Sequence, residues 1–339
     1  MGNHALLYRL QEAAIRSLYT EVKERTNGVA ELLPGTPGTL VKRAGTGHEY
    51  WYRSYYPAPR KRSEQFVGTA SNSAAYEIMQ GRIAHSEWTS KQVAALAKFG
   101  FVAADKQLAG ILVELHNRGV FRAGMVVSGV LAYASWLNEF GAIAPCPKTQ
   151  AHLELARPRP LKLPTAATFA SIMQATQLPF AATPASSRKK PTTSATVGGV
   201  TVDLLAPGAL SGEVIAVPEL GCHAQTLPFY GYLLEASCNA VILAGGHCIP
   251  VRVPDATRMI WYSLYMSTLR RKDTAACEND LLRGATLAAI LIEQQGLVLR
   301  ESYRSAPREL RNAAHSRLHR LEGVLAEHVQ ARDEFRRLR

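Results

Sequence analysis

The sequence has few cysteines, and no two of them are closely spaced. Five cysteines occur in 339 residues, at positions 146, 222, 238, 248 and 277, and they form no CxxC motif. An odd number without metal-binding spacing argues against both a zinc ribbon and a disulfide framework. The pattern fits a reducing cytosol, so we expect a cytoplasmic protein.

Long apolar runs are also missing. The most apolar stretches, "AVILAGG" and "MVVSGVLAYASWL", are too short or too interrupted to span a bilayer. The first residues have acidic side chains and helical periodicity over residues 5–26, and they lack the apolar core of a signal peptide. The sequence therefore predicts an intracellular, bacterial-type protein without a membrane segment.

Acidic residues are scarce relative to basic ones. The chain has 27 Asp and Glu against 39 Lys and Arg, which gives a formal charge of +12. A basic protein attracts phosphate-rich partners such as nucleotides, RNA or DNA. The alternative is that the excess charge lies on surface helices and a basic linker without a specific partner.

Periodicity divides the chain into three regions. Residues 1–100 are predicted to be helical with a short aromatic-basic hairpin, 101–253 to form an α/β core, and 254–339 to be helical. In the hairpin, the string "YWYRSYY" precedes a basic run, which is typical either of nucleic-acid stacking or of rings packed against the body. We expect the second.

The last 33 residues, 307–339, are predicted to form one basic amphipathic helix. We expect its apolar stripe to pack on the rest of the chain, with contact to a partner or to a second copy as the alternative. The stripe consists of Leu310, Leu318, Leu321, Val324 and Val329.

The core contains a pattern of polar residues that suggests chemistry. "HLELAR" alternates as a strand, over about 150–156, with His152 and Glu154 on one face. It follows a strand, a Gly-containing turn and a helix, and it precedes the strand "VDLLAPG", which contains Asp203. A Gly turn at a helix N-terminus lets a phosphate approach the backbone, and carboxylates on neighbouring strands can hold Mg²⁺.

Several strings in this order resemble a group of bacterial nucleotidyltransferase-fold proteins in the polymerase-beta superfamily. They span about residues 47–295 and include "YWYRSYY", "LHNRGVFRAGMVVSGVLAYASWLNEFG", "HLELAR", "VDLLAPG", "VPELGCHAQTLPFYGYLL" and "IPVRVPDATR". The resemblance implies an α/β (α+β) class and a polymerase-beta-type core with a mixed sheet, flanked by helical parts. It also implies metal-dependent transfer of a nucleoside monophosphate from an NTP to an acceptor hydroxyl.

The chain departs from the pattern of that family at its catalytic positions. The family's "GTHA"-like string corresponds to Gly129–Ala132, which places Val130 where a hydroxyl is usual. The paired aspartates of its "DID"-like strand correspond to His152 and Glu154, whereas the third carboxylate is retained as Asp203.

The resemblance therefore gives two groups of candidate site residues. The catalytic and metal-binding candidates are His152, Glu154 and Asp203. The candidates for phosphate contact are Ser128, Gly129 and Val130. Apart from the resemblance, the alternation of "VRVPD" points Arg252 away from Val251 and Val253, toward either the cleft or solvent, and makes Arg252 a further candidate for phosphate contact.

The identity of a bound metal is open at this point. The family's chemistry implies Mg²⁺ or Mn²⁺, whereas a His/Glu/Asp set also suits Fe²⁺ or Zn²⁺.

Two functions remain open, with a third beside them. The chain is an enzyme that uses an NTP and an RNA, protein or small-molecule acceptor, or it is a degenerate member that binds nucleotide, nucleic acid or protein. The third is a structural subunit that partners an active homologue.

Overall fold

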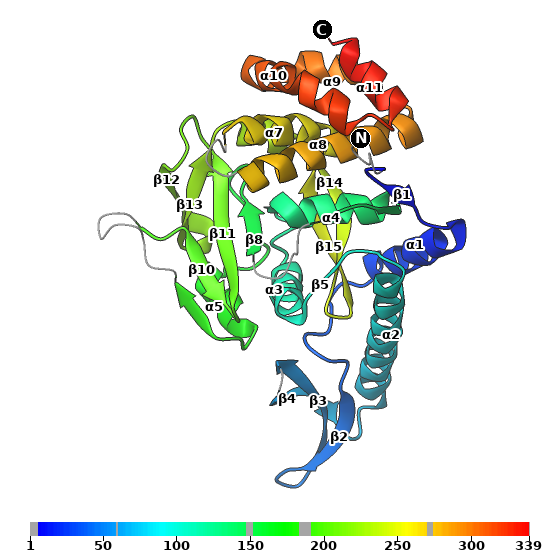
Figure 1. Cartoon of the computed structure of the whole chain (residues 1–339). Helices are drawn as coiled ribbons and strands as arrows, with labels where there is room; N and C mark the ends of the chain where they lie inside the picture. Colours follow the sequence, from blue (N-terminus) through cyan, green and yellow to red (C-terminus); the bar gives the residue numbers. More distant parts are fainter. Residues whose placement is uncertain (1–5, 59, 147–151, 183–190, 270–273, 339) are drawn as a thin grey trace.

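The computed structural model of the chain describes residues 6–58, 60–146, 152–182, 191–269 and 274–338 (Figure 1). It has the mixed α/β architecture that the sequence predicts. Among these residues, no helix is long and apolar enough to cross a membrane.

The largest sheet of the described structure is a mixed sheet of seven strands. In chain order the strands are β6 Val126–Val127, β8 His152–Ala156, β9 Phe180–Ala182, β10 Ser194–Val197, β11 Val200–Pro207, β12 Val214–Val217 and β13 Cys222–Leu227. Strand β11 is central: it pairs in parallel with β8 and with β13, and antiparallel with β10. In the β8–β11 register, Glu154 lies opposite Asp203, so their side chains share one face of the sheet.

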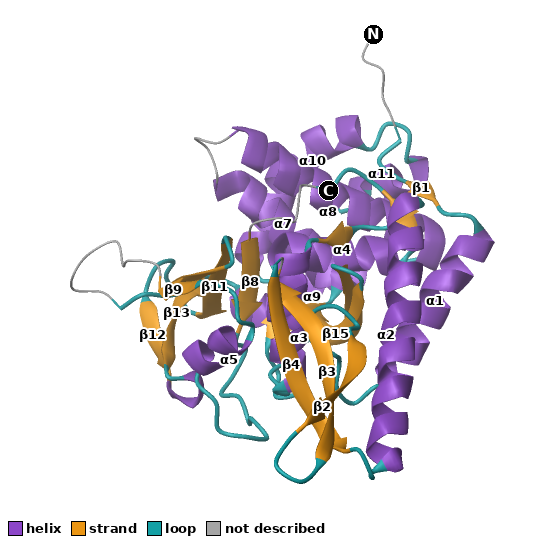
Figure 2. Cartoon of the chain, turned by 90° about the horizontal axis from the view of Figure 1, so that it is seen from below, coloured by secondary structure: helices purple, strands orange, loops and turns teal. Residues whose placement is uncertain are grey.

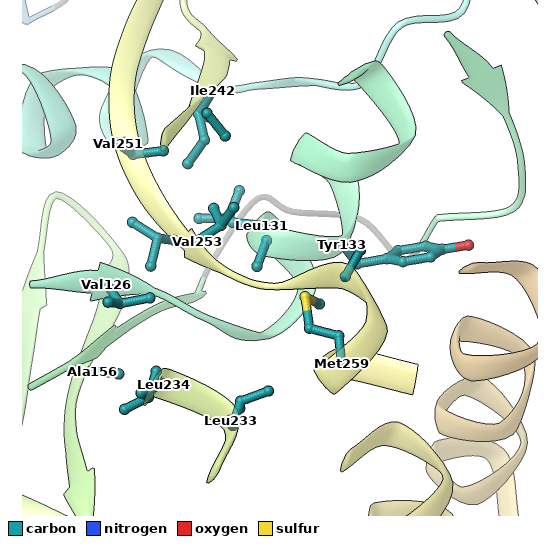
Figure 3. Packing of buried hydrophobic residues seen from close by; sticks show 14 of the residues in the cluster. Val126, Leu131, Tyr133, Ala156, Leu233, Leu234, Ile242, Val251, Val253 and Met259 are labelled. Atoms are coloured by element: carbon teal, nitrogen blue, oxygen red, sulfur yellow. The ribbon is translucent and has the colours of Figure 1, made fainter. Parts of the chain in front are cut away.

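Helix α4 (Gly129–Glu139) starts directly after β6 and packs on the hairpin of β14 (Ser237–Ala244) and β15 (His247–Pro254). Figure 3 shows Val126, Leu131, Ile242, Val251 and Val253 packed together at this junction. All five side chains are buried, and each contributes about 1.5–3 kcal/mol of transfer free energy. This packing fixes the position of the first turn of α4 against the sheet.

The N-terminal part covers the other side of the hairpin. Its elements are β1 Arg9–Leu10, α1 Ala13–Asn27, β2 Thr39–Ala44, β3 Glu49–Ala58, β4 Lys61–Thr69, α2 Ser73–Lys98, β5 Ala103–Ala104 and α3 Lys106–Asn117. Strands β2, β3 and β4 form a separate three-stranded sheet, which we call the ribbon. The ribbon extends from the end of the molecule opposite the C-terminal helices (Figure 1), and it lies in front when the molecule is seen from below (Figure 2).

Helices form the C-terminal part. They are α7 Ala256–Leu269, α8 Thr274–Gln295, α9 Leu299–Ser305, α10 Arg308–Val324 and α11 Val329–Arg336. The short elements of the middle of the chain that have not yet been named are β7 Ala142–Ile143, α5 Phe169–Ala175, η1 Pro218–Leu220 and α6 Tyr230–Glu235. Leu310, Leu318 and Leu321 of α10 are buried, and α10 packs on α7. The expectation that this stripe packs on its own chain is therefore confirmed, although Val329 is 52% exposed.

Two helix predictions were wrong, one in its interior and one at its start. The predicted helix 307–339 is two helices, because the chain turns between them to place His328 in the core, where its Nε2 accepts a hydrogen bond from the Leu7 amide. The predicted helix 5–26 begins only at Ala13, because Arg9–Leu10 pairs with β7 instead. The predicted hairpin of the N-terminal region gains β2 as a third strand.

Candidate functional site

A tight turn links β6 to α4. Ser128 is the N-cap residue of α4 and is 1% exposed, and its backbone N–H donates to the Glu154 carbonyl at 3.0 Å. Gly129 follows with φ of +66°, a left-handed conformation that an L-residue adopts only at a cost. The turn thus ties the start of the helix to strand β8.

The Glu154 side chain closes over this turn. Its Oε2 accepts hydrogen bonds from Ser128 Oγ at 3.2 Å and from the Tyr230 hydroxyl at 3.4 Å. A Cβ on Gly129 would lie only 2.6 Å from the carboxylate, so the Glu154 side chain fits in this position because residue 129 is a glycine. A negative charge is favourable here, since the first amides of a helix carry partial positive charge. Glu154 therefore occupies the space through which a phosphate would approach Gly129.

His152 lies between the two carboxylates. Its Nε2 is 2.6 Å from Asp203 Oδ2, and its Nδ1 is 3.9 Å from Glu154 Oε1. The other oxygen of Asp203 accepts a hydrogen bond from Ser194 Oγ. The imidazole is thus hydrogen-bonded to Asp203 and lies within ion-pair distance of Glu154.

The electrostatics favour a charged pair. The hydrogen bond to Asp203 raises the pKa of His152, with a further contribution from the Glu154 charge, while burial opposes the shift. Burial alone raises the pKa of Asp203, but the hydrogen bonds from His152 and Ser194 outweigh it and leave that pKa below its ordinary value. Both shifts favour an imidazolium next to a carboxylate.

Tyr230 closes the inner side of the site. Its hydroxyl lies 3.2 Å from Ser128 Oγ, and burial raises its pKa well above the ordinary value, so it remains a neutral donor. Its ring packs edge-on against Tyr262, with centroids 5.3 Å apart. These contacts hold the hydroxyl toward Glu154.

This arrangement does not fit a bound divalent cation. Nε2 of His152 and both oxygens of Asp203 are already engaged in hydrogen bonds within the site. Over the described residues, no three His, Cys, Asp or Glu side chains are placed to hold a metal ion. A cation could reach Glu154 and Asp203 only if His152 moved away.

The structure brings together most of the predicted site residues. His152, Glu154, Asp203, Ser128 and Gly129 form one cluster, and Val130 follows in the first turn of α4, partly buried and without a hydroxyl.

Arg252 lies elsewhere. Its guanidinium donates to Ser237 Oγ and to the Ser237 carbonyl, and it lines a cavity of about 620 Å³ with His116 and Arg122.

Two residues of the cluster were not predicted, Ser194 and Tyr230. The turn Gly198–Gly199 pairs Val197 with Val200, and counting back along both strands places Ser194 opposite Asp203. That turn was therefore a usable signal for Ser194. Tyr230 has no comparable signal, because only the tertiary packing of α6 brings it to Glu154.

Comparison with known proteins identifies one matching family and no individual similar protein. The model of a protein family described as nucleotidyltransferase matches residues 106–308. This match spans β6, α4, β8 and β11, the elements that build the cluster. The searches of curated proteins and of solved structures each gave no match.

Proposed function

Because this chain belongs to the nucleotidyltransferase family, we propose that it uses the family's fold as a binding module for a phosphate-bearing partner and does not transfer nucleotides. The observation that carries the proposal is the imidazole of His152 between the carboxylates of Glu154 and Asp203. The charge of +12 supports a phosphate-bearing partner. All five cysteines are free, which is consistent with a cytoplasmic protein.

Transfer of a phosphoryl group requires a cation that the imidazole does not replace. A divalent ion aligns the attacking oxygen, binds the phosphoryl oxygens and neutralises the charge that develops on them. Protonated His152 supplies one positive charge, and its Nε2–H is directed to Asp203 at 2.6 Å. The imidazolium neutralises the Asp203 carboxylate, but unlike a metal ion it has no free position at which a substrate phosphate could be coordinated.

The second obstacle is the Glu154 carboxylate at Gly129. A triphosphate that approached the start of α4 would meet this negative charge, which Ser128 and Tyr230 hold in place. Binding there would require Glu154 to leave both hydrogen bonds. The His152 imidazole and the Glu154 carboxylate together support the proposal that this chain does not catalyse nucleotidyl transfer.

Nucleotidyl transfer is the second candidate, because the turn Ser128–Gly129 and Asp203 are retained. If His152 turns outward, Glu154 and Asp203 are the residues that would hold Mg²⁺ or Mn²⁺. Such an ion would supply Lewis-acid chemistry there: the hydroxyl of an RNA, a protein or a small molecule would attack the α-phosphorus of an NTP and pyrophosphate would leave.

Label transfer separates the two candidates. The protein is incubated with NTPs that carry a radioactive α-phosphate, with Mg²⁺ or Mn²⁺ and with total RNA or protein as acceptor. We expect no transfer by the wild type. We expect transfer by a restored variant that combines His152→Asp, Glu154→Asp and Val130→Thr.

The control is the same restored variant with Asp203→Ala, which should be inactive. Transfer by the wild-type chain that disappears with Asp203→Ala alone would overturn the binding role and establish the enzyme.

A further inference from the structure

The ribbon has one face that is anchored to the body. Trp51 packs on Tyr76 of α2, with ring centroids 4.7 Å apart. Arg53 is fully buried, and its guanidinium donates to the carbonyls of Pro34, Thr36 and Pro37. The expectation that the ribbon packs its rings on the body therefore holds for this face.

The opposite face carries three aromatic rings, of which Phe66 is exposed and Tyr50 and Tyr52 are half-buried. Tyr52 on β3 lies directly across from Phe66 on β4, and their ring centroids are 5.6 Å apart. Tyr50 is the other neighbour of Phe66, at 6.0 Å. Phe66 is 57% exposed and lies between two half-buried tyrosine rings, so the three rings together form an accessible aromatic surface. We call Tyr50, Tyr52 and Phe66 the aromatic platform.

Arginines border the aromatic platform. Arg43 and Arg62 both pair with Glu64, at 2.6 Å and 3.4 Å, and Arg62 also donates to Ser54. Two cations thus share one carboxylate on an exposed surface.

The ribbon as a whole is positively charged. Among the described residues of 39–69, five exposed basic side chains compare with two exposed glutamates, Glu49 and Glu64. The basic residues are Lys42, Arg43, Arg60, Lys61 and Arg62. The fourth arginine of this segment, Arg53, is buried, so the surplus of charge that a partner can reach comes from these five side chains.

We infer that the aromatic platform binds single-stranded nucleic acid. Unpaired bases stack on exposed rings, and arginines at the border neutralise the adjacent phosphates. A duplex would contribute only its phosphates, because its bases are already stacked on each other. An acidic peptide would use the arginines and leave the rings without a partner. RNA and DNA share the chemistry that the platform recognises.

This inference deepens the binding role proposed above, but its test does not depend on nucleotidyl transfer. The carboxylate cluster and the aromatic platform share no residue. A negative result with label transfer leaves the platform untouched, and a negative result with nucleic acid leaves the status of His152 untouched.

Fluorescence anisotropy with the full chain measures the interaction. The probes are a labelled oligouridine and a labelled oligothymidine of about 12 nucleotides, and a duplex of the same length. We expect Tyr52→Ala and Phe66→Ala to weaken single-strand binding by about tenfold each. The matched control is Phe99→Ala, which removes a phenylalanine that is 50% exposed outside the ribbon and should change nothing.

Charge variants test the border independently of the rings. Glu64→Gln releases Arg43 and Arg62 and should tighten binding severalfold. Arg62→Gln should weaken it and reduce the slope of log K against log salt by about 0.7. Both residues are exposed, so these variants stay informative if an aromatic variant fails to fold.

Four results would overturn the inference. They are no single-strand binding at about 100 μM protein, tighter binding of the duplex, equal losses in Phe66→Ala and Phe99→Ala, and weaker binding by Glu64→Gln. If both single strands bind more tightly than the duplex, the inference is supported, and the tighter of the two identifies the preferred sugar.

Discussion

Replacing Gly129 by alanine should destabilise the protein in a way that identifies Glu154 as the cause. The residue has φ of +66°, and a new Cβ would lie 2.6 Å from the Glu154 carboxylate. The left-handed conformation costs an alanine about 1–2 kcal/mol. Displacing Glu154 from Ser128 and Tyr230 costs about 1–2 kcal/mol more, because its side chain is 26% exposed and water replaces part of those bonds. The total loss should be about 2–4 kcal/mol.

The chain contains a matched control for the backbone term. Gly296 has φ of +65°, and an added Cβ there meets nothing within 4 Å. Gly296→Ala should therefore lose only about 1–2 kcal/mol. Urea unfolding, followed by circular dichroism, gives the change in free energy of unfolding for each variant.

A double-mutant cycle with Glu154→Ala completes the test. In that background the excess loss of Gly129→Ala over Gly296→Ala should disappear, because no carboxylate remains over the turn. Equal losses for the two glycine variants in the wild-type background would refute the position of Glu154. If the excess loss of Gly129→Ala persisted in the Glu154→Ala background, the Glu154 carboxylate would not be its cause.

Three further predictions concern other parts of the molecule. Burial lowers the pKa of His247 below 6.5, so the unfolded chain binds a proton that the folded chain excludes, and stability should fall as the pH drops below about 6.5. His247→Gln should lose less free energy of unfolding than the wild type between pH 7 and pH 5, and an equal loss would contradict this. Phe335 is fully buried, with its ring 6.1 Å from that of Trp261, so Phe335→Ala should cost about 3–5 kcal/mol in urea unfolding, and a loss below about 1 kcal/mol would contradict the docking of α11. EDTA or millimolar Mg²⁺ should leave the Tm of the wild type unchanged, whereas Mg²⁺ should raise the Tm of a His152→Asp variant; a Mg²⁺-dependent rise in the wild type would indicate a working cation site.

The candidate cluster was predictable where it depended on strand periodicity. Alternation alone places His152 and Glu154 on one face of β8, and the parallel pairing of β8 with β11 brings Asp203 opposite Glu154. The sequence does not specify the rotamers that put the imidazole between the carboxylates. That contact depends on the strand register and on the hydrogen bond from Ser194.

Other features depended on tertiary packing and were less predictable. The alternation in "VRVPD" makes Arg252 a candidate for phosphate contact, yet its guanidinium donates to Ser237 on the neighbouring strand. The ribbon was expected to bury its rings, and alternation along β3 instead splits them between two faces. Trp51 is turned to α2, while Tyr52 is turned to Phe66. A strand with aromatics at consecutive positions carries no local signal for which face is covered.

We propose that the His152 imidazole excludes a cation from the space between Glu154 and Asp203. The most direct test is a crystal of the wild-type protein grown with Mn²⁺ and an NTP, with data collected near the manganese absorption edge. We expect no anomalous peak between the two carboxylates and an imidazole within hydrogen-bonding distance of Asp203. An anomalous peak ligated by Glu154 and Asp203, with His152 turned away, would contradict it.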